Sequence, residues 1–329
     1  MRKMFIFFAA FWVSFMTIYS VYYYKVSSKL DESVVAEAKD LPNTIIGIAP
    51  LKDADKNMVY SEGISQVIPT AIKDSATYLS DVPDTDFVSF NGTYSKAHIE
   101  KFYEGLVTKF INHPPIDFKN LKDNDKLLLS YFFENVRLPD GFRVSEKSID
   151  FKGKKIRALQ YHPHTASDTG KVTFYKNEKS QEYALKVKIN DGKDEVLMYY
   201  NPLCHIWAEA STKAKEFTEN RENKYLLSKD ESVLVPEIDF NIVKDFNKEK
   251  DYFNTVLDNY NLVEERIKLK ISPPKTGGPL EVNESFNTAN NYIMSGNVFY
   301  TIRETDKTKP YCVIYVTNPE ILKPARVRH

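Results

Sequence analysis

Cysteine and glycine are both scarce in this chain of 329 residues. The only cysteines are Cys204 and Cys312, which excludes a small domain held by several disulfides and leaves open one bridge or two free buried thiols. The 11 glycines form no GxxxxGKS/T or GxGxxG motif, and the chain has no GxSxG nucleophile elbow. The sequence therefore offers neither a phosphate-binding loop nor a recognisable catalytic nucleophile.

An excess of either charge is also lacking. Lys and Arg together number 45, as do Asp and Glu, so the formal net charge is zero. Proteins that bind nucleic acid normally carry a basic excess, so we expect no nucleic-acid partner. His162-Pro163-His164 and Cys204-His205 contain metal-binding residue types, but no further residues at ligand spacing accompany them. We interpret these histidines as loop and strand-edge residues, and we expect no cofactor.

No acid–base pair stands out either. The adjacent residues Glu264 and Glu265 are interpreted as a solvent-facing pair that follows a helix. We therefore expect that the protein is not an enzyme. A Ser-His-Asp triad assembles in space rather than along the chain, so an unrecognised hydrolase stays as an alternative.

Apolar residues, by contrast, are plentiful: 42% of the chain is hydrophobic, enough for a large folded core. At the N-terminus, Arg2 and Lys3 precede an uncharged run over residues 4–24. In a helix this run spans about 30 Å, the thickness of a bilayer core. Residues 1–25 are therefore predicted to be a signal anchor, which crosses the membrane, or a cleaved signal peptide. Both alternatives direct the rest of the chain into the secretory pathway, as a single-pass membrane protein or a secreted one.

Two N-glycosylation sequons fit this localisation, with Asn91 and Asn283 as the candidate acceptors. Residues 26–42 are polar and charged, and we interpret them as a stalk. One α+β domain is predicted over residues 43–322, followed by a basic tail over 323–329.

Within this domain the apolar spacing predicts a helix over 95–111 and a buried strand over 126–136. Asn190-Asp191-Gly192 is typical of a hairpin turn between two strands. Further strands are expected in the segments 142–144, 156–161, 172–175, 183–189, 195–200, 233–240, 267–271, 298–303 and 311–316. Further helices are expected within 207–230 and 252–260.

Several of these segments resemble motifs of the serpin family. The closing hairpin, residues 299–303 and 312–319, is the most specific likeness. Leu280–Glu284 resembles the end of the strand that enters the serpin reactive loop, and Val233–Ile238 resembles a second serpin strand. Leu127–Phe133, followed by Phe142, resembles a third. The resemblance covers about residues 90–322 and implies a large mixed β-sheet with smaller sheets and packed helices.

Inhibitory serpins trap proteases when a cleaved reactive loop inserts into the main sheet as a new strand. The resemblance gives hinge-like residues, Glu281, Val282, Asn283 and Glu284, and reactive-loop candidates, Tyr292, Ile293, Met294 and Ser295. Fourteen residues, 285–298, separate Glu284 from Phe299 and reach about 50 Å when extended, which is short for the family. The Asn that the family carries in the main sheet is replaced by Leu129 or Ser130.

These departures favour a serpin-like protein that does not inhibit proteases and has a binding or structural role. The alternative is a serine-type endopeptidase inhibitor with a short reactive loop and a bait residue near Met294. Its partner would be a protease, whereas the first hypothesis requires another extracellular or lumenal protein.

Overall fold

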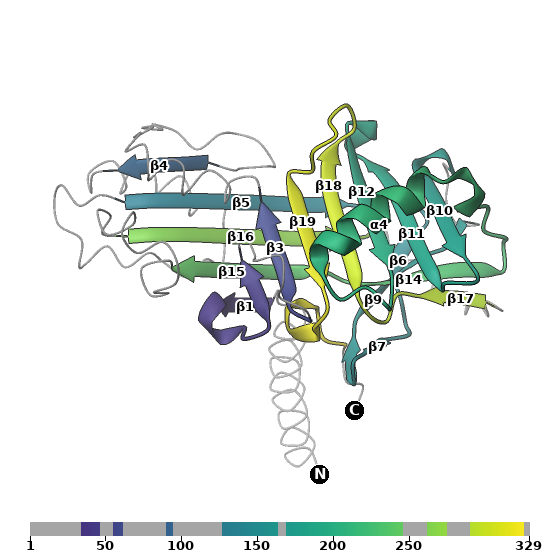
Figure 1. Ribbon diagram of the computed structural model, residues 1–329, viewed down its shortest axis with the longest axis horizontal. Coiled ribbons are helices and arrows are strands. Elements are labelled where there is room, and N and C mark those ends of the chain that lie inside the picture. The colour runs from purple at the N-terminus through teal and green to yellow at the C-terminus, as the bar shows by residue number, and fades with distance from the viewer. Residues whose placement is uncertain are drawn as a thin grey trace, which may run out of the picture.

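The computed structural model describes residues 34–46, 55–61, 90–94, 127–163, 169–245, 262–274 and 290–325. Three mixed or antiparallel sheets of five, eight and four strands dominate this part of the chain, and we name them sheets A, B and C (Figure 1). The long strands of sheet A run horizontally in the view, and those of sheet B cross them steeply. The fold class is α+β.

Sheet A has an unusual centre, because two parallel strands lie between antiparallel neighbours. β16 pairs with β5 in parallel over eleven residues, from Leu262 opposite Leu127 to Ser272 opposite Arg137. β15 runs antiparallel to β16, and β4 runs antiparallel to β5. In spatial order the strands are β1 (Val34–Glu37), β15 (Asp239–Asp245), β16 (Leu262–Ser272), β5 (Leu127–Arg137) and β4 (Phe90–Tyr94).

Sheet B is antiparallel except at its β2–β3 edge. The predicted turn between β11 and β12 is confirmed: Asn190, Asp191 and Gly192 have positive φ angles of 48°, 55° and 85°. Asn, Asp and Gly adopt this left-handed region more readily than other residues. In spatial order the strands are β13 (Lys224–Tyr225), β10 (Val172–Asn177), β11 (Glu182–Ile189), β12 (Asp194–Tyr200), β18 (Val298–Glu304), β19 (Cys312–Val316), β3 (Asn57–Ser61) and β2 (Thr44–Ile46).

Helix α4 (Trp207–Glu219) covers one face of sheet B (Figure 1). It buries Ala210, Ala214 and Phe217, whose spacing of four and three residues places them on one helix face. Short 3-10 helices complete the description: η1 (Ala38–Asp40), η4 (Thr169–Lys171), η5 (Asn190–Gly192), η6 (Arg221–Asn223) and η7 (Pro319–Ile321).

Sheet C contains β17 (Asn290–Ile293), β14 (Glu231–Pro236), β9 (Ala158–Tyr161) and β6 (Phe142–Val144), in that order. A separate hairpin joins β7 (Ile149–Phe151) to β8 (Lys154–Ile156). The single strand predicted over 233–240 is wrong, because the chain passes from β14 in sheet C to β15 in sheet A at Glu237-Ile238. Pro236 ends the first strand, and a proline cannot donate a ladder hydrogen bond.

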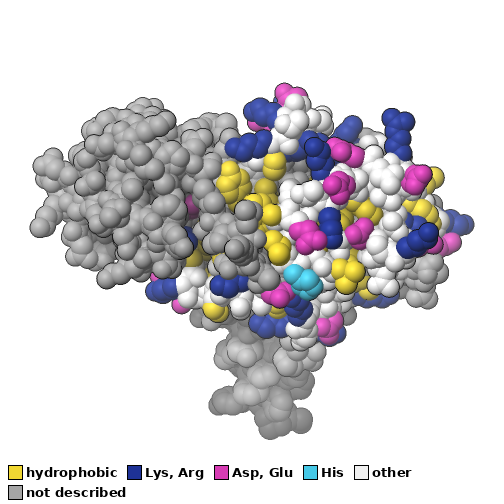
Figure 2. Space-filling view, viewed as in Figure 1, with side chains coloured by type: hydrophobic (Ala, Val, Ile, Leu, Met, Phe, Trp, Pro, Cys, Tyr) yellow, Lys and Arg dark blue, Asp and Glu magenta, His cyan; other side chains and the backbone are white. Residues whose placement is uncertain are grey.

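The main core lies among the three sheets, and a second cluster lies under α4. Phe132 of β5 is 0% exposed in the first cluster, and Phe299 of β18 is 2% exposed in the second. Strong apolar patterning in these two strands therefore predicts burial correctly. On the surface, acidic and basic side chains are interspersed over the face in Figure 2, as expected of a chain without net charge.

Both predicted ends of the domain need correction. Val34–Glu37, assigned to the stalk, forms β1 and pairs in parallel with β15. Lys323, assigned to the basic tail, is 2% exposed, and its ammonium lies 2.9 Å from the Asp239 carboxylate. A stalk or tail is recognised by polarity, and polarity does not reveal main-chain pairing or a buried ion pair.

The predicted helices at 95–111 and 252–260 and the N-terminal segment 1–25 lie outside the described residues. Across the ranges that the structure describes, no helix is both long and apolar enough to cross a membrane.

Candidate functional site at the β17 junction

The reactive-loop candidates lie on and just after β17, at the edge of sheet C. Val233 lies opposite Tyr292 and Leu234 opposite Ile293 in a parallel pair, and the Met294 N–H donates to the Leu234 carbonyl at 3.0 Å. Ile293 is 41% exposed, but Met294 is 0% exposed. Tyr292 and Ser295 are partly buried. Because a protease must reach a bait side chain, this conformation does not present Met294 as one.

Tyr292 is held by a carboxylate on the neighbouring strand. Its hydroxyl donates to Glu231 Oε1 at 2.6 Å. The Tyr225 hydroxyl lies 3.1 and 3.2 Å from the two oxygens of the same carboxylate, and the Ser228 N–H donates to Oε2 at 2.7 Å. Burial alone would raise the pKa of Glu231, but these donors outweigh it and hold the pKa below its ordinary value. The charged carboxylate is therefore the stable form at neutral pH.

Lys176 of β10 completes the polar cluster. Its ammonium lies 3.6 Å from the centroid of the Tyr225 ring and 5.3 Å from that of the Tyr292 ring, at cation–π distances. It also donates to the Tyr292 hydroxyl at 3.1 Å and pairs with Glu178 at 2.9 Å. Burial opposes the charge on Lys176, but Glu178 and the phenols raise its pKa above the ordinary value.

Aromatic rings of sheet B also pack against Tyr292. Its ring centroid lies 5.0 Å from that of Phe174 and 5.3 Å from that of Tyr183. Tyr183 in turn stacks on Tyr200, with centroids 5.7 Å apart. Burial, followed by the hydrogen bond to Glu231, raises the pKa of Tyr292 to about 12. β17 is thus anchored to sheet B as well as to sheet C.

The connection that leads into β17 begins at the end of β16. β16 ends at Ser272 and β17 begins at Asn290, so residues 273–289, seventeen in number, join the two strands. The hinge-like residues Glu281–Glu284 begin nine positions beyond Ser272 and lie outside the described residues. Because the connection begins at the end of β16, counting its residues from Glu284 underestimates its length. Seventeen extended residues span roughly 60 Å.

The interpretation of Glu264 and Glu265 as a solvent-facing pair that follows a helix is wrong. Both lie in β16, where their exposed fractions are 7% and 0%. Glu264 forms an ion pair with Arg266, two residues along on the same face of the strand. Glu265 points to the opposite face, toward the core. The period-2 pattern of Ile267, Leu269 and Ile271 on that face is the signal that could have placed Glu265 inside.

The histidines and cysteines do not assemble a metal centre within the described ranges, where no group of three or more His, Cys, Asp or Glu is suitably placed. His162 is buried, and His205 lies 3.0 Å from Asp55 on the surface. His164 lies outside the described residues. Cys204 and Cys312 are free buried thiols, and burial raises the pKa of both.

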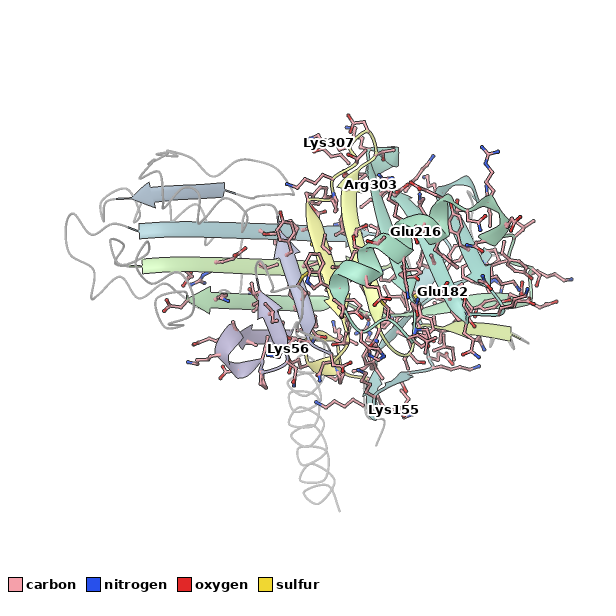
Figure 3. All side chains as sticks on the ribbon, in the orientation of Figure 1. Lys56, Lys155, Glu182, Glu216, Arg303 and Lys307 are labelled. Carbon is pink, nitrogen blue, oxygen red and sulfur yellow. The ribbon has the colours of Figure 1, made fainter. Side chains whose placement is uncertain are left out.

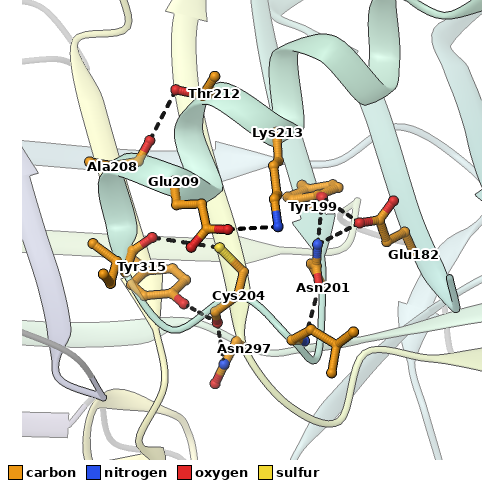
Figure 4. Close-up of polar contacts among 12 residues, drawn as sticks. Glu182, Tyr199, Asn201, Cys204, Ala208, Glu209, Thr212, Lys213, Asn297 and Tyr315 are labelled. Atoms are coloured by element: carbon orange, nitrogen blue, oxygen red, sulfur yellow. Dashed lines mark hydrogen bonds and ion pairs between the residues drawn. The ribbon is translucent and has the colours of Figure 1, made fainter.

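Several hydrogen bonds hold the turn around Cys204 in place (Figure 4). The Cys204 carbonyl accepts hydrogen bonds from the Asn297 amide and, at 2.5 Å, from the Tyr315 hydroxyl. The Asn201 amide donates to Glu182 at 2.5 Å and to the Tyr199 hydroxyl at 3.0 Å. These bonds join the β12–α4 turn to β11, to β19 and to Asn297, the residue before β18.

Of the two glycosylation candidates, Asn91 lies on β4 opposite Ser130 of β5. The side chain of Asn91 is not described, and Asn283 lies outside the described residues. Figure 3 places Lys307, beside the β18–β19 turn, and Lys155, on the β7–β8 hairpin, at opposite margins of the molecule.

No protein-family model and no curated protein matches the chain. Among solved structures, the fold is similar to several serpins. Manduca sexta serine protease inhibitor (serpin)-12 matches with a TM-score of 0.45 and 7% identity over 80% of this chain and 93% of that one.

Two further structures show the same likeness. Native protease nexin-1, solved with heparin, matches with a TM-score of 0.46 and 9% identity over 80% of this chain and 92% of that one. SRPN18 from Anopheles gambiae matches with a TM-score of 0.38 and 8% identity, and the match covers 58% of this chain and 55% of that one. These values describe a similarity of fold, and no activity is transferred from them.

Proposed function

We propose that this chain is a serpin-like binding protein that does not trap proteases by loop insertion. The observation that supports it is the position of Pro273-Pro274 directly after β16, the central strand of sheet A. We further propose that residues 4–24 direct the protein to the secretory pathway, where its partner is an extracellular or lumenal protein.

An inserted strand would have to separate β16 from β5, which pair up to Ser272 opposite Arg137. One residue further on, the Leu138 N–H donates to the Ser272 carbonyl at 2.9 Å. The chain just beyond Ser272 would therefore have to enter the gap first. A central strand needs N–H donors along its length, and proline supplies none.

The rest of the connection is also poorly suited to a central strand, because residues 273–279 read PPKTGGP and contain three prolines. Glycines 277 and 278 add no side chain to pack in a central strand. Residues 281, 283 and 284 are Glu, Asn and Glu, which cost free energy if they are buried without partners. Composition, rather than a short loop, thus argues against insertion.

Protease inhibition is kept as the second candidate function because of the length of the connection. Seventeen residues are enough, by length alone, to supply a strand as long as the eleven-residue pairing of β16 with β5. The length of the connection therefore does not exclude insertion, in contrast to the expectation based on a shortened loop. The case against insertion depends on the prolines.

A cleavage experiment separates the two functions. The full chain is cut once within residues 275–289, for example after Glu281 or Glu284 with a Glu-specific protease, and the melting temperatures of cut and intact protein are compared. We expect the cut form to melt at the same or a lower temperature, and we expect no covalent complex with serine or cysteine proteases on a denaturing gel. A cut form that melts tens of degrees higher, or a covalent band, would contradict the proposal.

The matched control replaces Pro273, Pro274 and Pro279 with Ala, which restores three N–H donors without changing the length of the connection. If the prolines are the obstacle, only this variant gains thermal stability after cleavage.

A further inference from the structure

Glu265 is a fully buried carboxyl group at the centre of sheet A. It lies on β16 with an exposed fraction of 0%, directly opposite Lys244 of β15 and Ser130 of β5. Side chains alternate along a strand, so Glu265 shares the core-facing side of β16 with Ile267 and Leu269, which are also fully buried. The carboxyl group is therefore placed in the apolar layer between sheets A and B.

Hydrogen bonding satisfies only part of this carboxyl group. Oε1 accepts a bond from the Ser61 hydroxyl of β3, at 3.2 Å. Oε2 is buried and has no hydrogen-bond partner in the described part of the chain. Buried polar atoms without partners are uncommon in folded proteins, and an ionised carboxyl in this position would cost far more than a neutral one.

The charged and titratable groups on the neighbouring described strands offset the burial of Glu265 only in part. The Lys244 ammonium donates to the Ile46 carbonyl of β2 at 3.2 Å, and its charge favours the ionised form of Glu265. Glu134 of β5 lies on the same core-facing side, opposite Leu269, and Cys312 of β19 is a buried thiol opposite Ser61. Burial raises the pKa of Glu265 well above its ordinary value, and Ser61 and Lys244 offset this only in part.

We propose that Glu265 acts as a proton-controlled latch that keeps β16 paired with β5 while its carboxyl group is neutral and favours their separation when the proton is released to water. The latch does not depend on the proposed binding function. It acts on the strand that leads into residues 273–289, so the protonation of one core residue sets how readily sheet A opens.

The direction of the pH effect follows from linkage. A carboxyl group whose pKa is raised by folding contributes stability that is fully present below its unfolded pKa and is lost as pH rises through its folded pKa. Opening that exposes Glu265 to water releases one proton. Between the pKa of the exposed carboxyl group and the higher pKa of the buried one, the opening equilibrium constant should therefore increase by about tenfold per pH unit, and above the folded pKa it should no longer change.

Hydrogen exchange measures this opening directly. The exchange of β5 and β16 amides in the full chain is followed from pH 6 to pH 10 and divided by the intrinsic rate at each pH. In the wild type we expect protection of both strands to fall with pH. In Glu265→Gln, which keeps the shape and removes the titrating proton, we expect protection to stay constant over the same range.

A second variant tests the direction of the pH effect. Ser61 stabilises the ionised form of Glu265, so Ser61→Ala should raise the pKa of the buried carboxyl group, and protection should go on falling to higher pH than in the wild type before it levels off. A merely structural role for Ser61 would lower protection at every pH instead. The control is Glu195→Gln, a buried carboxyl in sheet B that pairs with Arg303 at 2.8 Å, and this variant should keep the pH dependence of the wild type in β5 and β16.

The proposal is overturned if wild-type protection of β5 and β16 does not change between pH 6 and pH 10. It is also overturned if Glu265→Gln shows the same pH dependence as the wild type, or if protection in the Ser61→Ala variant levels off at lower pH than in the wild type.

Discussion

The hydroxyl of Tyr292 lies 2.6 Å from the carboxylate of Glu231, and this bond joins the strand after the connection to the body of the molecule. Glu231 is 6% exposed, so the bond is largely shielded from water. Replacing Tyr292 with Phe removes the donor and keeps the ring. We expect unfolding in urea to cost about 1.5–3 kcal/mol less free energy, the range for a hydrogen bond to a charged group. Exchange of the β17 amides should also become faster.

The control for this prediction is Tyr183→Phe. The Tyr183 ring belongs to the same aromatic cluster, and its hydroxyl makes no hydrogen bond within the described part of the chain. This variant should change stability by much less than Tyr292→Phe. Equal losses in the two variants would mean that the rings, rather than the hydroxyl–carboxylate bond, hold β17.

The same bond predicts a pH dependence. The pKa of Glu231 is lower in the folded chain than its ordinary value, so its stabilising contribution is present above the unfolded pKa and is lost as pH falls through the folded pKa. The stability difference between wild type and Tyr292→Phe should therefore be largest at neutral pH and should shrink toward about pH 3. Urea unfolding at several pH values checks this, and a constant difference would contradict it.

Core truncation gives a prediction with a clear magnitude. Phe132 and Phe299 are 0% and 2% exposed, and each lies in a different core cluster. Replacing either one with Ala should reduce the free energy of unfolding by about 3–5 kcal/mol, because the cavity is only partly refilled. Leu226, 90% exposed, is the control, and Leu226→Ala should have almost no effect. Losses below about 1 kcal/mol at both phenylalanines would show that the two strands are misplaced.

Membrane topology is the third subject for a test. If residues 4–24 direct translocation, both sequons reach the lumen, and a host that glycosylates should modify Asn91 or Asn283. Treatment with peptide-N-glycosidase should then increase the mobility of the wild type on a gel, and the double variant Asn91→Gln, Asn283→Gln should not shift. Digestion of the domain by a protease added on the cytosolic side of sealed vesicles would contradict the assignment.

The sequence predicts the strands of this fold well where the apolar pattern is strong. Continuous apolar runs identify β5 and β19, and alternation with a turn signal identifies β11 and β12. The strand predicted over 267–271 is confirmed, but it begins earlier, at Leu262. Its first half contains Glu264, Glu265 and Arg266, and charged residues do not suggest a buried strand unless their tertiary partners are known.

The candidate site is predicted less well than the fold, for a physical reason. Tyr292 is held by Glu231, Lys176 and Tyr225, three residues that lie 61 to 116 positions away in the chain. Nothing in the local sequence around Tyr292 distinguishes an exposed loop from an edge strand. The pairing register of β17 against β14 makes this segment an edge strand. Register between distant segments is set by packing rather than by local preference.

The pairing of β3 with β19 has a consequence for how the chain is made. Met58 lies opposite Tyr315, and Asn57 Oδ1 accepts the Thr317 N–H at 2.8 Å. β3 therefore leaves the ribosome long before its neighbour exists, and its edge stays open until residues 312–316 have been synthesised. Contacts between such distant segments slow folding, and a fragment that stops before β19 leaves sheet B incomplete.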